Sequence, residues 1–258
     1  MPFVTSDGAD IYWKVEGETD RPRLVLLNSI GTDMDLWSRV LPLLREHVAV
    51  LRIDTRGHGA SDAPPGDYDL PGLARDVAAA MDAAGWASAQ VAGVSLGGMI
   101  AMRMALDMPE RVTGLIPICT SATMDRAAWT TRVDTVRRDG MAGIVDLAMS
   151  RFLSPAFIAE RPGHAATIRR GLLTMRAEGY AGCAAAIRDM ALSDRLGGIA
   201  CPTLVISGER DSSTPYAGHG DHLVSAIPGA RHIALPAAHL APLEAPDALA
   251  DAILNHRS

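Results

Sequence analysis

Ser95 stands at the centre of the most informative motif of the chain, Gly93-Val94-Ser95-Leu96-Gly97. An apolar run at residues 89–92 precedes the motif, and a run typical of a helix follows it at residues 98–102. A sharp turn from strand to helix strains its central residue, and glycines beside that residue avoid clashes with neighbouring backbone. The motif therefore predicts a serine hydroxyl at the end of a strand, beside a helix N-terminus, where it can act as a nucleophile.

Such a serine needs a base to take its proton, and the base needs a carboxylate to orient it. In a sheet with this motif, the acid follows the serine along the chain and the histidine comes last. Residues 203–208 form an apolar run and a glycine turn, after which Asp211 opens the loop Asp-Ser-Ser-Thr-Pro. We predict Asp211 as the acid because this loop can anchor its side chain. Glu209 is the alternative acid, and an aspartate at this position can also simply form a turn.

His239 is the predicted base. It follows the last strand pattern in a loop of small residues at positions 236–242, so it can approach Ser95. The other histidines precede the acid, lie in a strand pattern, fall in the polar loop after the acid or follow the last helix: His47, His58, His164, His219, His222, His232 and His256. The motif order thus favours a triad of Ser95, Asp211 and His239, which is suited to acyl transfer.

The oxyanion of an acyl transfer needs two backbone N–H donors. One donor is expected from Leu96, directly after the serine, and the other from Ile30, in the loop after an early strand. Ser29, in the same loop, is a candidate substrate contact. The alternative interpretation is that this loop is a plain turn at the end of a strand.

The loop at residues 54–61 is rich in reactive side chains, but we expect it to be structural. Its glycines suit a tight turn near the serine, and Asp54 and Arg56 can hold it by hydrogen bonds. His58 precedes Ser95 in the chain, so the motif order argues against His58 as the base.

The composition favours one substantial domain, with 258 residues of which 48% are hydrophobic. The net charge is −6 and the chain has no basic stripe, so we expect no nucleic-acid partner. Cys119, Cys183 and Cys201 lack metal or redox spacing, and no His/Asp/Glu cluster has ligand spacing, so no metal is expected. The sequence shows no signal segment and no apolar run of membrane length, which favours a cytoplasmic protein without a membrane partner. No pattern predicts an oligomeric state.

Hydrophobic patterns predict strands that alternate with helices. Expected strands cover residues 3–5, 11–15, 23–28, 48–54, 90–95, 114–119, 203–207 and 231–235. Expected helices cover residues 36–45, 70–84, 96–108 and 247–255. The first two strands are separated by a turn signal and should form a hairpin. The alternation predicts an α/β fold with a mostly parallel sheet covered by helices on both faces.

Residues 121–198 lack strand patterns and carry Ala, Met, Leu and Arg at helical spacing, with breaks at Pro155 and at Pro162-Gly163. We therefore predict a core domain formed by residues 1–120 and 199–258, and a helical cap formed by residues 121–198. The cap is expected to lie over the edge of the sheet where the parallel strands end.

Several segments together resemble one family. They are Asn28-Ser-Ile-Gly-Thr-Asp33 with Trp37, Asp54-Thr-Arg-Gly-His-Gly, Ser95-Leu-Gly-Gly-Met99, Trp129-x-x-Arg132, residues 179–188 and Ser207-Gly-x-x-Asp211. From about residue 11 to residue 239, the sequence is similar to the 3-oxoadipate enol-lactonases of the α/β-hydrolase superfamily. The resemblance implies an α/β-hydrolase fold and hydrolysis of 3-oxoadipate enol-lactone to 3-oxoadipate in aromatic catabolism, with no cofactor.

The resemblance also implies a substrate that carries a carboxylate, although the protein is net negative. A local cation must then attract the substrate, and Arg132 is the candidate, because it lies one helical turn from Trp129 on the same expected face. Trp129 and Arg132 are both candidate substrate contacts. An exposed cap arginine is the alternative interpretation. The sequence departs from the family pattern at Ala184, at Ala191 and at Phe152-Leu153, all in the cap.

Other functions fit the same triad. A carboxylesterase or a cofactor-free perhydrolase acting on other small esters or lactones is the alternative enzyme. A ligand receptor on a hydrolase fold is the alternative from another class, since a fold alone does not fix function.

Overall fold

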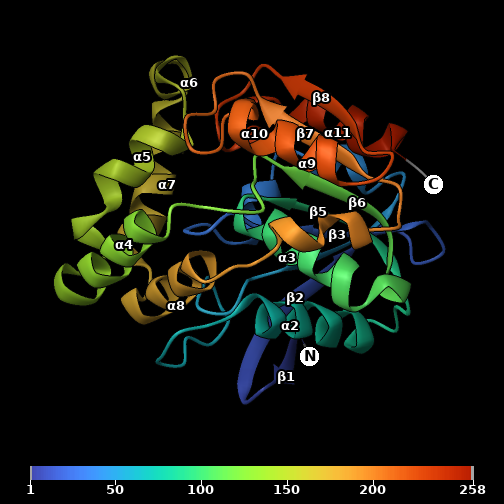
Figure 1. Ribbon diagram of the computed structural model, residues 1–258, viewed down its shortest axis with the longest axis horizontal. Helices are drawn as coiled ribbons and strands as arrows, with labels where there is room; N and C mark the ends of the chain where they lie inside the picture. The colour runs from blue at the N-terminus through green and yellow to red at the C-terminus, as the bar shows by residue number, and fades with distance from the viewer. Residues whose placement is uncertain (1, 257–258) are drawn as a thin grey trace.

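Eight strands form one mixed sheet in the computed structural model, which describes residues 2–256 (Figure 1). The order across the sheet is β1-β2-β4-β3-β5-β6-β7-β8. The strands are β1 (Phe3–Ser6), β2 (Ala9–Glu16), β3 (Arg23–Leu27), β4 (Ala49–Ile53), β5 (Ala89–Val94), β6 (Val112–Ile118), β7 (Leu204–Gly208) and β8 (Arg231–Leu235). The pairs β1–β2 and β2–β4 are antiparallel and all other pairs are parallel, so β3 to β8 end at one carboxyl edge.

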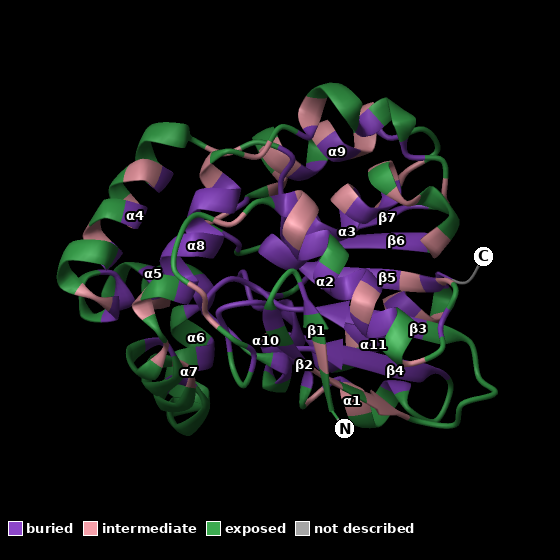
Figure 2. Cartoon of the chain, turned by 90° about the horizontal axis from the view of Figure 1, so that it is seen from below, coloured by how far each residue is buried: buried purple, intermediate pink, exposed green. Residues whose placement is uncertain are grey.

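Helices cover both faces of this sheet (Figure 1). They are α1 (Leu41–Leu44), α2 (Leu70–Ala83), α3 (Leu96–Asp107), α9 (Asp221–Ala226), α10 (Ala241–Glu244) and α11 (Pro246–Asn255). The helices α2 and α3 pack together on one face, and α1 packs against α11 on the other. The central strands are buried on both faces, as Figure 2 shows, because their side chains are apolar on both sides.

The predicted α/β fold is confirmed, and each expected strand is present within about two residues of its predicted bounds. The hairpin at the N-terminus is also confirmed. Asp7 and Gly8 form its turn with φ angles of 43° and 75°, the combination that suits a tight hairpin between twisted strands.

The helix predicted at residues 36–45 was wrong. That segment holds a short 3₁₀ turn at Met34–Trp37, capped by the side chain of Asp33, and then the single turn of α1. Pro42 lies in the first turn of α1 and has no N–H to donate, so one long helix through this segment would lose a hydrogen bond. Buried residues at helical spacing produced the pattern without a continuous helix.

Five helices lie between β6 and β7, on the left of Figure 1. They are α4 (Arg126–Asp139), α5 (Val145–Phe152), α6 (Pro155–Glu160), α7 (Pro162–Thr174) and α8 (Ala177–Arg188), called the cap helices below. The predicted breaks are present, since α6 begins at Pro155 and α7 at Pro162. The division into two domains with borders at residues 120/121 and 198/199 stays a prediction.

At one contact between the cap helices and the core, the two backbones leave no room for a side chain. A Cβ atom built on Gly179, in α8, would lie 2.3 Å from the carbonyl oxygen of Gly57, and one built on Gly57 would lie 2.5 Å from the Cα of Gly179. Gly57 also has a φ of +86°, which favours glycine. This contact therefore requires glycine on both sides.

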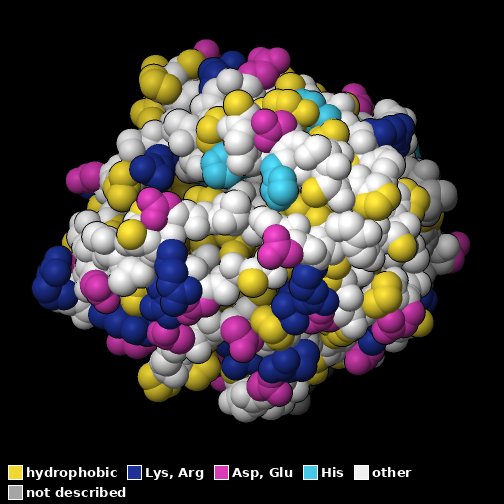
Figure 3. Space-filling model, viewed as in Figure 1, with side chains coloured by type: hydrophobic (Ala, Val, Ile, Leu, Met, Phe, Trp, Pro, Cys, Tyr) yellow, Lys and Arg dark blue, Asp and Glu magenta, His cyan; other side chains and the backbone are white. Residues whose placement is uncertain are grey.

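None of the helices within residues 2–256 combines the length and the apolar character needed to cross a membrane. On the face shown in Figure 3, acidic and basic side chains lie next to one another rather than in separate patches.

We predict that Gly179→Ala destabilises the protein by about 1–3 kcal/mol, because its methyl group has no room against Gly57. Alanine is otherwise the better helix former, by about 0.5–1 kcal/mol. The matched control is Gly171→Ala in α7, where a Cβ meets nothing within 4 Å and should stabilise the protein. Urea unfolding measures both variants, and equal stabilisation by both would contradict the close contact.

Candidate active site

Ser95 occupies the strained turn between β5 and α3. Its φ and ψ angles are 54° and −116°, in a region that non-glycine residues rarely adopt. Both of its backbone polar groups are held by the end of β6: its N–H donates to the carbonyl of Ile118 at 2.9 Å, and its carbonyl accepts from the hydroxyl of Thr120 at 2.6 Å. The neighbouring strand thus fixes the serine in this conformation.

The glycines around Ser95 are required by close backbone contacts, as predicted. A Cβ on Gly93 would lie 2.2 Å from the carbonyl carbon of Gly97, and a Cβ on Gly97 would lie 2.6 Å from that of Leu27. The Gly97 N–H also donates to the carbonyl of Asn28 at 3.0 Å. The first turn of α3 is therefore packed directly on the end of β3.

Asp211 and His239 form a buried pair at the carboxyl edge of the sheet. His239 Nδ1 lies 3.0 Å from Asp211 Oδ2. The expected anchoring of Asp211 is present, since its carboxylate accepts from the N–H of Ser213 at 2.8 Å and from the hydroxyl of Thr214 at 2.8 Å. Burial alone would raise the pKa of Asp211, but His239 and these hydrogen bonds lower it to about 2.

Neighbouring contacts bring the loop of His239 toward Ser95. The hydroxyl of Thr120 donates to the carbonyl of Ser95. The thiol of Cys119, which precedes Thr120, lies 3.8 Å from the carbonyl of Ala238, which precedes His239. Within residues 2–256, no hydrogen bond joins the Ser95 hydroxyl to His239. Catalytic hydrogen bonds are often long without substrate and tighten in the complex. The rival acid, Glu209, is exposed and outside this cluster.

The two backbone N–H groups predicted to bind an oxyanion belong to segments at the carboxyl edge of the sheet. The N–H of Leu96 opens α3, where it has no intrahelical acceptor, and the N–H of Ile30 lies in the loop after β3. Neither donates to another group within the described residues. The adjacent Ser29 is buried, and its hydroxyl points to its own loop, 3.4 Å from the carbonyl of Ile30.

His58 binds the loop that carries Ile30 by accepting a hydrogen bond from Gly31. The N–H of Gly31 donates to His58 Nε2 at 2.9 Å, so the proton of the neutral ring must sit on Nδ1, which lies 3.2 Å from the carbonyl of Arg56. Burial lowers the pKa of His58 to about 4, and the hydrogen bond to Arg56 offsets only part of the effect. His58 is a neutral acceptor that holds Gly31 directly after the candidate donor Ile30.

The loop at residues 54–61, which carries His58, is structural, as expected. The Asp54 carboxylate accepts from the N–H groups of Met34 and Ala60, both at 2.8 Å. The guanidinium of Arg56 forms two hydrogen bonds, of 2.6 and 2.8 Å, with the buried carboxylate of Asp76. These bonds fix both ends of the loop that presents His58.

The cap helices close directly over Gly31. A Cβ on Gly31 would lie 2.7 Å from Leu172, 3.5 Å from Tyr180 and 3.6 Å from Phe152, and its φ of +84° again favours glycine. The ring of Phe152 also stacks on His239, with the ring centroids 5.9 Å apart. One aromatic ring thus lies beside both the candidate oxyanion loop and the candidate base.

The predicted pair on α4 does share one face. The Arg132 guanidinium lies 4.4 Å from the ring centroid of Trp129, and its Nη1 lies 3.4 Å from the hydroxyl of Tyr180. Arg132 is half-buried and makes no ion pair with a carboxylate within residues 2–256. The three cap departures differ in place: Ala184 is buried in α8, Ala191 is exposed after it, and Phe152-Leu153 is buried at the end of α5.

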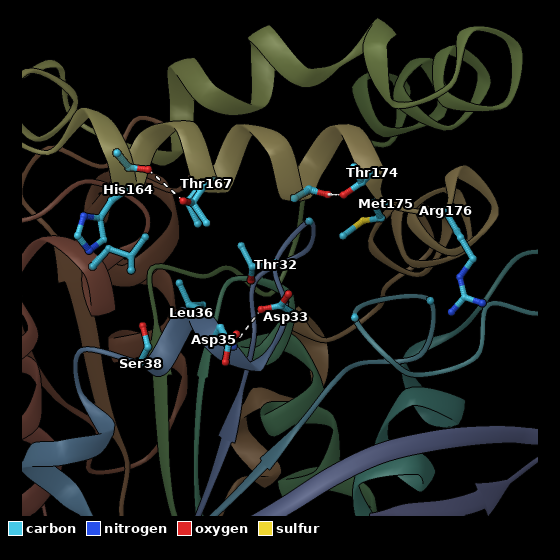
Figure 4. Close-up of a pocket in the computed structure, with 17 residues that line it drawn as sticks. Thr32, Asp33, Asp35, Leu36, Ser38, His164, Thr167, Thr174, Met175 and Arg176 are labelled. Atoms are coloured by element: carbon cyan, nitrogen blue, oxygen red, sulfur yellow. Dashed lines mark hydrogen bonds between the residues drawn. The ribbon is translucent and has the colours of Figure 1, made fainter.

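A cavity of about 800 Å³ lies beside this cluster rather than on it. One wall is the loop from Gly31 to Ser38, and the opposite wall is α7, as Figure 4 shows. Ser95, His239 and Arg132 do not line it, and Gly31 is the residue that it shares with the candidate oxyanion loop. Within the described residues, no three His, Cys, Asp or Glu side chains gather in a way that could hold a metal.

Three further residues make contacts in this region that no local sequence pattern predicts: Phe152, Tyr180 and Glu244. Phe152 and Tyr180 lay in segments that were singled out, but nothing in the sequence showed that they meet at Gly31. Glu244 follows His239 by five residues on α10, and its position there was the only available signal.

A family model described as alpha/beta hydrolase fold matches residues 22–246. 3-Oxoadipate enol-lactonase 2 of Acinetobacter baylyi is 33% identical over 251 residues, which cover 97% of this chain and 94% of that protein. The solved structure of the enol-lactonase from Burkholderia xenovorans LB400 matches with a TM-score of 0.95 at 33% identity and covers 98% of both chains. A hydrolase from Pseudomonas aeruginosa PA01 matches with a TM-score of 0.94 at 38% identity, covering 98% of this chain and 96% of that one.

We predict that His58 makes stability depend on pH. Because folding lowers its pKa from 6.5 to about 4, the unfolded chain binds the extra proton first, and stability falls as the pH drops through this window. From pH 7 to pH 4 the wild type should lose about 3 kcal/mol more than His58→Gln, which keeps an acceptor for Gly31 but does not titrate. The exposed His47→Gln is the control, and urea unfolding is the measurement. Parallel profiles for the wild type and His58→Gln would refute the assignment.

Proposed function

The chain belongs to the α/β-hydrolase fold family, and we propose that it is a serine-dependent enol-lactonase that opens 3-oxoadipate enol-lactone to 3-oxoadipate. The observation that carries the proposal is the buried His239–Asp211 pair at the same sheet edge as the strained Ser95. Similarity to two enol-lactonases over nearly the whole chain, cap helices included, supports the substrate.

In the proposed mechanism, the Ser95 hydroxyl oxygen attacks the lactone carbonyl carbon while His239 takes the hydroxyl proton. Asp211 orients the imidazole and stabilises its positive charge. The N–H groups of Ile30 and Leu96 bind the negative oxygen of the tetrahedral intermediate. The free state of both N–H groups supports this assignment.

Collapse of the intermediate breaks the ring C–O bond and leaves the acyl group on Ser95. The released oxygen belongs to an enolate of the same molecule. His239 passes the proton that it took from Ser95 to this enolate, which becomes a ketone, and the imidazole is neutral again. An enolate is a good leaving group, so cleavage of the ring C–O bond needs little general-acid catalysis by His239. Water, activated by His239, then attacks the acyl-enzyme and releases 3-oxoadipate, which restores the serine.

Arg132 is proposed to bind the substrate carboxylate. A protein of net charge −6 does not attract an anion as a whole, so a local cation has to do so. Arg132 has no carboxylate partner of its own in the described part of the chain, and Trp129 and Tyr180 hold its planar guanidinium in one orientation. Such a preorganised fork suits a carboxylate, which it can bind through two hydrogen bonds.

We expect Ser95→Ala to lose at least about a thousandfold in kcat, because the remaining groups bind the substrate but cannot form the acyl-enzyme. The measurement is steady-state hydrolysis of 3-oxoadipate enol-lactone and of p-nitrophenyl acetate by wild type and variant. Near-normal turnover by Ser95→Ala would refute the mechanism. Wild-type activity on the simple ester alone would indicate an esterase or perhydrolase, and a single slow turnover would indicate a receptor.

We expect Arg132→Ala to raise KM for the acidic lactone by about 10- to 100-fold, which corresponds to about 1.5–3 kcal/mol for a charged hydrogen bond. KM for the neutral p-nitrophenyl acetate should stay within about twofold. The matched control is Arg138→Ala, an exposed arginine on the same helix that pairs with Asp139. An unchanged KM for the lactone in Arg132→Ala would leave Arg132 as a structural residue of the cap helices.

A further inference from the structure

Glu244 is an enclosed carboxylate that the proposed mechanism does not use. It ends the short helix α10, five residues after His239, and its side chain is only 2% exposed. A carboxylate in such a place is costly unless charges or hydrogen-bond donors compensate it. The groups that compensate Glu244 come from three different parts of the chain.

Both oxygens of Glu244 are used. Oε1 accepts from the N–H of Ser154 at 2.6 Å, and Oε2 accepts from the N–H of Ala238 at 3.2 Å. Oε2 also lies 3.6 Å from the Arg210 guanidinium. One carboxylate therefore joins the start of α6, the loop of His239 and the loop of Asp211.

The partners of Glu244 are the direct chain neighbours of the candidate pair. Ala238 precedes His239, and Arg210 precedes Asp211. Arg210 additionally links the two loops, because its guanidinium donates to the carbonyl of Pro236 and its N–H donates to that of Ala237 at 2.9 Å.

The third partner, Ser154, belongs to the cap segment that touches the imidazole. Two residues before it, Phe152 stacks on His239, and the carbonyl of Phe152 accepts from the N–H of Leu240 at 3.1 Å. The His239 loop is thus held to the end of α5 at His239 itself and at Leu240. Glu244 adds a link from Ala238, in the same loop, to Ser154.

We propose that Glu244 is a positioning residue: it fixes the His239 loop against Asp211 and ties both to the cap helices, so that the seating of the cap and the orientation of the imidazole change together. The proposal rests on the proposed function for the role of His239. A carboxylate suits this position because it only accepts hydrogen bonds and can receive both N–H groups at once. A glutamine would turn an NH₂ group toward one of them and break that contact.

The test compares Glu244→Gln with Glu209→Gln, which makes the same change of charge at an exposed position on the Asp211 loop. Glu244→Gln should lower kcat for p-nitrophenyl acetate by about 10- to 100-fold with KM changed less than about threefold, because binding groups stay in place. Glu209→Gln should match the wild type in both constants.

A spectroscopic measurement separates positioning from a general loss of stability. The proton of His239 between Nδ1 and Asp211 should give a downfield proton NMR signal, identified by its absence in Asp211→Asn. In folded Glu244→Gln this signal should shift or broaden, whereas Glu209→Gln should leave it in place. A folded Glu244→Gln with wild-type kcat and an unmoved signal overturns the proposal.

If Glu244→Gln does not fold, Arg210→Met decides the question, because its side chain is 49% exposed and its loss leaves both N–H contacts of Glu244 intact. It should lower kcat by about 2- to 5-fold and move the same signal, and unchanged values overturn the proposal. The NMR readout needs no substrate. A protein that does not open the lactone but shows these shifts would contradict the proposed function and leave the positioning role standing.

Discussion

The strained backbone of Ser95 is the constraint on which the rest of this edge of the protein depends. A residue held with these angles costs on the order of 1–3 kcal/mol, and it persists only where the surroundings fix it. Here β3 and β6 do so, through the packing of Gly97 on Leu27 and the hydrogen bonds to Ile118 and Thr120. The central strands must therefore meet the first turn of α3 at backbone distance before Ser95 can hold this conformation.

Buried polar side chains also fix the loops around Ser95 through hydrogen bonds. Asn28 donates to the carbonyl of Ile53 at 2.6 Å and accepts from the indole of Trp37 at 3.1 Å, which fixes the start of the loop that carries Ile30. His58 then holds Gly31, and Asp54 holds the next turn at Met34. These side chains therefore hold the loops at the sheet edge through hydrogen bonds made inside the protein.

The sequence predicted what depends on local pattern and chain order. Strands, the hairpin and the breaks of the cap helices follow from periodicity, glycine and proline, and the anchoring of Asp211 follows from the turn residues after it. The helix at residues 36–45 was wrong because buried side chains at helical spacing do not show where Pro42 interrupts the hydrogen bonds. The contacts of Phe152 and Glu244 join residues about 90 positions apart, and no local pattern carries that information.

Phe152 has a consequence for how such an enzyme can acquire new substrates. Its ring stacks on His239 and would lie 3.6 Å from a Cβ built on Gly31, so a change in its size alters the surroundings of the candidate oxyanion loop and of the imidazole in one mutation. Selection for a new substrate at this position is therefore coupled to catalytic efficiency. A substitution of Phe152 therefore requires compensating changes elsewhere, which makes its effects epistatic, whereas a substitution at a cap position that does not touch His239 does not carry this coupling.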